Sequence, residues 1–159
     1  MDAQEFLILE SDIAAQLANI DDAIARVQDR SQDFNADEAP DMQLESMAFQ
    51  IHNTYNAIEE LLRLIAAHFE NQISDVTRWH AALLHRMTLP VPGVRPAPLS
   101  KETFLLLDAL RGFRHFFRHA YMTSVDPGLL QSNLQRTRQV HSLLHRDITE
   151  FLDQIRPAK

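Results

Sequence analysis

The 159-residue sequence contains no cysteine, which excludes disulfides, thiolate metal sites and cysteine nucleophiles. It has only three glycines and no sustained alternation of polar and apolar residues, so an extensive β-sheet is not expected. No apolar run approaches the about 18 residues that span a bilayer. Acidic residues near the start are unlike the basic beginning of a signal peptide. We expect one cytoplasmic domain over residues 1–159, with no membrane contact.

Basic side chains are scarce in the first third of the chain. Residues 1–50 contain twelve acidic and two basic side chains, whereas residues 101–159 contain nine basic and six acidic ones, within a net charge of −7. An anionic ligand should therefore bind the C-terminal third. The acidic N-terminal third could face a basic partner, although a solvated helix face is the more ordinary interpretation.

Apolar residues recur every three or four positions along three long stretches, which is the spacing of helices that bury one face. These stretches are Phe6–Val27, Leu44–Phe69 and Leu130–Ile155. A shorter helix is expected from about Ser74 to Met87. Ser100 has the properties of an N-cap residue, and the helix after it should continue to Phe117 or slightly beyond.

Residues 90–98 contain four prolines, which cannot lie in a helix interior because each lacks a backbone N–H and clashes with the preceding turn. We expect this segment to be an extended, fairly stiff strap over the helices. The sequence therefore predicts an all-α fold. Its arrangement should be an antiparallel four-helix up-and-down bundle, with an extra short helix and the Pro-rich strap between the second and third main helices.

Basic, imidazole and aromatic side chains crowd into residues 111–122, Arg-Gly-Phe-Arg-His-Phe-Phe-Arg-His-Ala-Tyr-Met. Arginine supplies fixed positive charge for phosphate oxygens, and histidine exchanges protons near neutral pH. This combination suits phosphodiester chemistry. Arg114 and His119 are five residues apart, about 140° around a regular helix. The helix must therefore distort or end near His119, or a second copy of the chain must complete the site.

Arg114, His119 and Tyr121 match the Arg-x4-His-x-Tyr motif of the HEPN superfamily. More narrowly, the chain resembles the HepT-like RNase toxins, which are encoded beside a minimal nucleotidyltransferase antitoxin. The resemblance covers about residues 40–155 and is carried by four stretches, namely Tyr55–Leu62, Trp79–Leu84, Arg95-Pro96 and Phe113–Tyr121. The motif near the end of the third main helix of an all-α chain is its most specific part.

The resemblance implies that Arg114 and His119 are the catalytic pair of a ribonuclease that needs neither metal nor cofactor. The substrate would be tRNA or mRNA, cleaved by attack of its own 2′-OH. No carboxylate cluster accompanies the motif to hold magnesium, which agrees with this expectation. The resemblance further implies a homodimer with a composite active site, and a nucleotidyltransferase antitoxin that silences the toxin by attaching AMP to Tyr121.

Three neighbours of the catalytic pair, Arg111, His115 and Arg118, are candidates for RNA binding, because basic side chains steer phosphate backbones. His115 departs from the superfamily pattern, in which Asn or Asp often follows the motif arginine. This departure puts in doubt the role of a polar, non-titrating neighbour and supplies a second imidazole instead.

Two histidine pairs, His115 with His119 and His141 with His145, have a spacing of four residues that could bind zinc. No third ligand can be assigned to either pair from the sequence, and His141 falls on the expected core face of the last helix. We therefore predict no metal site.

The alternative function is a non-catalytic helical subunit that binds substrate for, or interacts with, a nucleotidyltransferase. Such a subunit has no need for an arginine and a histidine that act on one phosphate. Growth arrest on expression that depends on Arg114 and His119 would separate the two functions.

Overall fold

The computed structural model describes residues 1–70, 79–119 and 124–157, and the side chains of residues 79 and 115–119 lie outside this description. Its helices are α1 (Ala3–Arg30), α2 (Asp41–Glu70), α3 (Trp79–Arg86), α4 (Lys101–His119) and α5 (Pro127–Ile155). The described residues form helices and connecting loops without a strand, which confirms the all-α prediction. None of these helices is long and apolar enough to cross a membrane.

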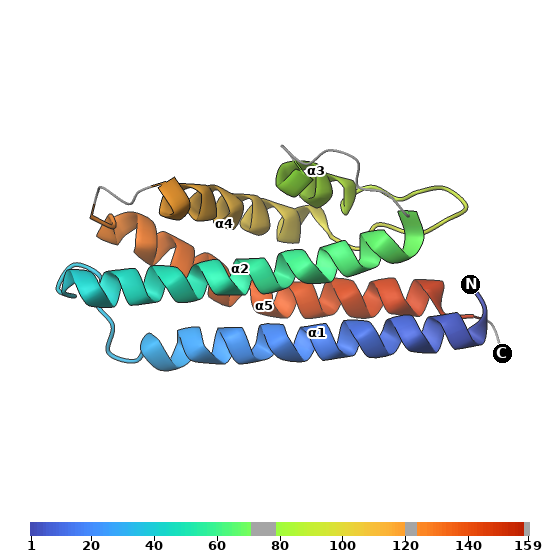
Figure 1. Cartoon of the computed structure of the whole chain (residues 1–159), viewed down its shortest axis with the longest axis horizontal. Coiled ribbons are helices and arrows are strands. Elements are labelled where there is room, and N and C mark those ends of the chain that lie inside the picture. The colour runs from blue at the N-terminus through green and yellow to red at the C-terminus, as the bar shows by residue number, and fades with distance from the viewer. Residues whose placement is uncertain (71–78, 120–123, 158–159) are drawn as a thin grey trace.

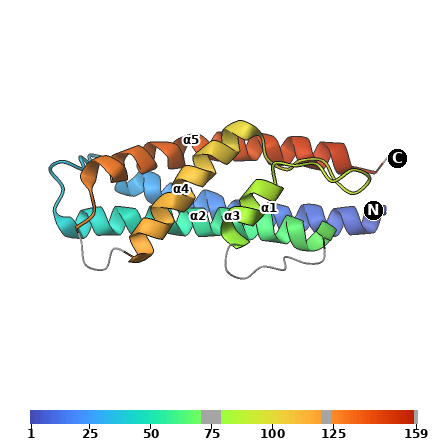
Figure 2. The same ribbon diagram turned by 90° about the horizontal axis from the view of Figure 1, so that it is seen from above.

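The three long helices α1, α2 and α5 lie alongside one another, and α4 lies over α2 and α5 (Figure 1). Helices α2 and α5 run in one direction, and α1 and α4 run in the other. Seen from above, α4 crosses α2 and α5 obliquely, and the short α3 lies beside it (Figure 2). The regular packing of a four-helix up-and-down bundle stays a prediction.

The core lies where α1, α2 and α5 meet. Ile13 and Ile20 of α1, Ile58 of α2, and Leu144 and Ile148 of α5 are fully buried. The spacing of seven residues in the α1 pair and of four in the α5 pair brings each pair to one face of its helix. Burial of each such side chain contributes about 1.5 to 3 kcal/mol, so the apolar stripes seen in the sequence account for the association of the long helices.

The start of α4 is fixed to α5 by a buried carboxylate. Ser100 caps α4, because its Oγ accepts the backbone N–H of Thr103, which confirms the cap expected from the sequence. Asp147 of α5 accepts a second set of hydrogen bonds, from the Ser100 N–H at 2.8 Å and the Thr103 hydroxyl at 2.6 Å. These bonds lower the pKa of Asp147 despite its burial. The N-terminal end of α4, the helix that carries Arg114, is therefore held in place on α5.

The Pro-rich segment is not helical, as its prolines require, but it does not run extended as expected. The Val91 N–H donates to the Arg95 carbonyl at 2.8 Å, and the Val94 N–H donates to the Val91 carbonyl at 2.9 Å. Gly93 lies at the turn with a φ of 75°, a conformation that glycine adopts without steric cost. The segment therefore turns back on itself within five residues.

Arg95 anchors this turn from inside the protein. Its side chain is 0% exposed and pairs with Glu70 at the end of α2, whose side chain is 5% exposed. The Arg95 Nε lies 2.8 Å from a Glu70 carboxylate oxygen. Arg95 Nη1 donates to the carbonyls of Leu89 and Pro96. Arg86 of α3 also pairs with Glu70, so one carboxylate joins α2, α3 and the turn.

Candidate functional site

Arg114 of α4 is held by α2. Its side chain is partly buried, and its Nε donates to Oδ1 of Asn56 at 2.9 Å. A guanidinium bound through Nε still has its two terminal nitrogens, which are the pair that forks onto phosphate oxygens. The contact therefore fixes the position of the charge without using the atoms that would bind a phosphate.

Arg114 also determines which atoms of the Asn56 side chain donate and accept hydrogen bonds. A guanidinium only donates, so Asn56 must turn its oxygen toward Arg114 and its amide nitrogen toward His52. The distance from Asn56 Nδ2 to His52 Nε2 is 3.0 Å. The amide nitrogen only donates, so His52 Nε2 must accept and this ring nitrogen carries no proton. Donation thus runs from Arg114 to Asn56 and from Asn56 to His52, which is the last acceptor of this chain.

Glu59, one turn further along α2, is a buried carboxylate that is 6% exposed. His80 of α3 lies with its Nδ1 2.6 Å from Glu59 Oε2. Burial, followed by the charge of Glu59 and a hydrogen bond to it, raises the pKa of Tyr55 well above its ordinary value, while Arg111 and Arg114 act in the opposite direction. Tyr55 therefore stays protonated beneath the two arginines of α4.

Arg111 lies one turn before Arg114 on α4, and its Nε donates to Asp108 at 2.9 Å. Both members of this pair are partly exposed, with side chains 32% and 45% accessible. An exposed pair with this spacing is weak, so it leaves Arg111 able to exchange its partner for a phosphate. Arg111 and Arg114 form the described basic part of the sequence-predicted site.

The other predicted site residues are only partly within the described structure. The α4 backbone is helical through His119, but the side chains of His115, Arg118 and His119 lie outside the description. Tyr121 lies outside it entirely. A catalytic role for His119, RNA binding by His115 and Arg118, and modification of Tyr121 stay predictions.

The structure adds residues that the sequence interpretation did not assign. Asn56 and Glu59 were quoted only as part of a stretch on the second helix, and His80 only as part of the short helix. A usable signal was present, because His52, Asn56 and Glu59 are spaced by four and three residues. That spacing places three polar side chains along one side of a helix that is otherwise core-forming.

The placement of His141 in the core was wrong. Its side chain is 33% exposed, and its Nε2 lies 2.7 Å from Oδ1 of Asp21 on α1. His145 contacts the same oxygen at 2.7 Å. The third potential ligand that sequence spacing could not supply therefore comes from another helix. This group belongs to the α1–α5 contact and not to the Arg114 site.

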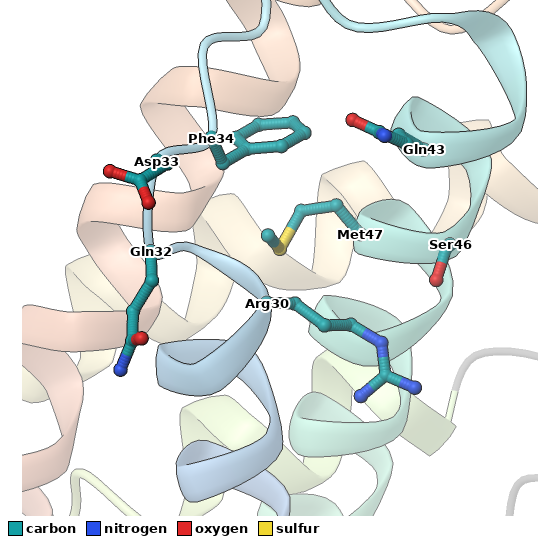
Figure 3. Close-up of a pocket in the computed structure, with 7 residues that line it drawn as sticks. All are labelled: Arg30, Gln32, Asp33, Phe34, Gln43, Ser46 and Met47. Carbon is teal, nitrogen blue, oxygen red and sulfur yellow. The ribbon is translucent and has the colours of Figure 1, made fainter.

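A hollow of about 400 Å³ lies between the end of α1 and the start of α2. Figure 3 shows Phe34 and Met47 along it, with Arg30 and Gln43 on its flanks. Neither Arg114 nor Asn56 is among its lining residues. The hollow is therefore not the place where the sequence-predicted chemistry would occur.

Comparison with known proteins gives one finding. A family model described as HepT-like protein matches residues 46–155, which is more than half of the chain. The match includes α2 from its second turn, α3, α4 and α5 up to its last residue. Searches of curated proteins and of solved structures gave no significant match.

Proposed function

Because the chain belongs to the HepT-like family of the HEPN superfamily, we propose that it is the toxin of a bacterial type II toxin–antitoxin pair. Its activity is that of a metal-independent endoribonuclease in the cytoplasm. The observation that supports this function is the anchored guanidinium of Arg114, which is held through Nε by Asn56. The contact uses only Nε, and the two terminal nitrogens of a guanidinium are a pair that can fork onto phosphate oxygens.

In the proposed reaction, the RNA 2′-OH attacks the adjacent phosphorus and the 5′-oxygen of the next nucleotide leaves. His119 takes the proton of the attacking hydroxyl, and the His119 of a second copy gives a proton to the leaving oxygen. Arg114 binds the phosphate and stabilises the charge that develops on its oxygens. Arg111, His115 and Arg118 guide the RNA backbone.

The helix geometry supports the proposal of a homodimer with a composite site. Helix α4 continues through His119, so Arg114 and His119 leave a regular helix about 140° apart. One copy does not direct both groups at one phosphate from a regular helix. Two copies packed through the ends of their α4 helices would place the arginine of one beside the histidine of the other, which is the assembly we propose.

A single 2′-deoxy substitution tests the reaction. An RNA oligonucleotide that is cut at one position should become inert when the nucleotide on the 5′ side of that position lacks its 2′-OH. The unmodified RNA should give a fragment that ends in a 2′,3′-cyclic phosphate, seen by mass spectrometry, with or without a chelator. A 3′-hydroxyl end, or undiminished cleavage of the deoxy substrate, would contradict the mechanism.

Tyr121 is the proposed site at which a nucleotidyltransferase antitoxin attaches AMP. The added phosphate would bring negative charge and bulk near the arginines and occupy the position of the substrate phosphate. After co-expression with the antitoxin, intact-mass measurement should show the mass of one AMP group added to the wild type and none to Tyr121→Phe. The other tyrosine, Tyr55, is only 2% exposed, so it provides an internal control. An unmodified toxin that is nevertheless neutralised would remove this part of the proposal.

A further inference from the structure

Two imidazoles and a carboxylate converge at the contact between α1 and α5. His141 and His145, one turn apart on α5, each lie with Nε2 2.7 Å from the same oxygen of Asp21 on α1. The three potential ligand atoms all lie within 4.8 Å of one another. The two rings are 5.1 Å apart between centroids, with an angle of 81° between their planes. Each ring therefore directs one nitrogen at a common point.

This arrangement differs from two other polar contacts described at the ends of the α1 and α5 helices. Arg138 contacts Ser31 and Arg156 contacts Glu10, each through one cation and one acceptor. At Asp21, a single carboxylate oxygen receives two imidazole nitrogens, so both rings must carry a proton on Nε2. A metal ion would replace both of these hydrogen bonds with two nitrogen ligands and one oxygen ligand.

We propose that Asp21, His141 and His145 form a binding site for one divalent transition-metal ion of the zinc type. Two histidines four residues apart on one helix are a common zinc-binding spacing. Imidazole nitrogen suits zinc, whereas magnesium and calcium prefer oxygen ligands. Three protein ligands leave the fourth tetrahedral position for water. The proposal is independent of the ribonuclease function.

Zinc binding would require the three ligand atoms, which lie within 4.8 Å of one another, to shift from their present positions. Zinc binds histidine nitrogen and carboxylate oxygen at roughly 2.0 to 2.2 Å, which separates tetrahedral ligand atoms by about 3.3 Å. The nitrogen-to-oxygen distances of 2.7 Å must therefore increase by roughly half an ångström. The side chains are 33%, 38% and 44% exposed, so an ion and its water ligand have access from solvent.

Such an ion would bind the N-terminal helix to the family domain. Asp21 lies outside the family match at residues 46–155, whereas both histidines lie within it. The site is therefore expected to contribute to the stability of α1 on α5. It would have no part in RNA cleavage, because the Arg114 contact is made between α2 and α4.

Titration of the metal-free full-length protein with ZnCl2 tests the proposal. Calorimetry should show one saturable ion per chain. At a free zinc concentration about 100 times the dissociation constant, the melting temperature should rise by about 5 to 10 °C. Co²⁺ should bind at the same site and develop the visible absorption of a tetrahedral complex. MgCl2 at the same concentration should produce neither change.

Variants connect the binding to the three residues. Asp21→Asn keeps an oxygen for hydrogen bonding, and His145→Ala removes one imidazole, so each should weaken zinc binding by at least about tenfold. His68→Ala, an exposed histidine on α2, and Asp22→Asn, an exposed neighbour on α1, serve as matched controls and should bind as the wild type does. Absence of stoichiometric zinc binding, or equal affinity in Asp21→Asn and the wild type, would overturn the proposal.

Discussion

Replacement of Arg114 by alanine should slow RNA cleavage by about 100- to 1,000-fold, because in the proposed reaction it removes the charge that stabilises the transition-state phosphate. Growth arrest on expression should be lost with it. His119→Ala should have an effect of similar size through the loss of proton transfer. Single-turnover cleavage of a defined RNA measures the rate. Arg138→Ala, which removes an exposed arginine of α5 that contacts Ser31, should cleave at the wild-type rate.

Substitution of Asn56, which holds Arg114 in position, should have a smaller effect than loss of Arg114 itself. Asn56→Leu removes the oxygen that holds the guanidinium without removing the charge, so cleavage should fall by less than in Arg114→Ala. The melting temperatures should be compared, since a role limited to packing would lower stability and leave the rate constant of the folded enzyme unchanged. A wild-type chain that is harmless on expression and inert toward RNA would instead favour the non-catalytic nucleotidyltransferase subunit.

Glu70→Gln should lower the free energy of unfolding by about 3 kcal/mol, the largest stability effect that we expect. The substitution leaves the guanidinium of Arg95, which is 0% exposed, without a counter-charge, and breaking a buried pair from one side is costly. In a chain of this size the melting temperature should fall by about 10 °C. Glu60→Gln breaks an exposed pair with Arg63 and should change stability by less than about 1 kcal/mol.

The same pair gives a pH dependence with a definite sign. Hydrogen bonds from Arg86 and Arg95 hold the pKa of Glu70 below its usual value, although burial acts in the opposite direction. The pair's contribution to stability is therefore complete above the ordinary glutamate pKa, about 4.3, and is lost as the pH falls through the lower folded-state pKa. The stability difference between wild type and Glu70→Gln should narrow as the pH is lowered from 7 to 3. A constant difference would contradict this explanation.

The long helices were predictable because their information is local. Apolar residues at three- and four-residue intervals predicted helices over Phe6–Val27, Leu44–Phe69 and Leu130–Ile155, and α1, α2 and α5 contain these ranges. The cap at Ser100 was likewise visible in one residue and the turn that follows. Such features depend on neighbours along the chain and need no knowledge of tertiary contacts.

The conformation of the Pro-rich segment could not be predicted from local sequence in the same way. Proline constrains its own backbone and excludes a helix, but it does not determine where the chain turns. That choice depends on the positive φ of Gly93 and on the pairing of Arg95 with Glu70, which is 25 residues earlier. No local pattern specifies a partner at that distance.

The candidate site residues show the same division between local and distant information. Arg114 was identified from its motif, but its anchor Asn56 is 58 positions away in the chain. The histidine pair of α5 was visible as a spacing, whereas its carboxylate partner Asp21 is 120 positions from His141. The sequence indicated which side chains could do chemistry, and the packing of helices α1, α2, α4 and α5 determined which of them meet.

The start of α1 and the end of α5 lie at one end of the long helices, and the turn from α1 to α2 and the end of α4 lie toward the other (Figures 1 and 2). An affinity tag or a fluorescent fusion attached before α1 or after α5 would therefore lie at the opposite end of the long helices from the C-terminal end of α4. Tagged protein should be suitable for cleavage assays and for pull-down of the proposed antitoxin without removal of the tag.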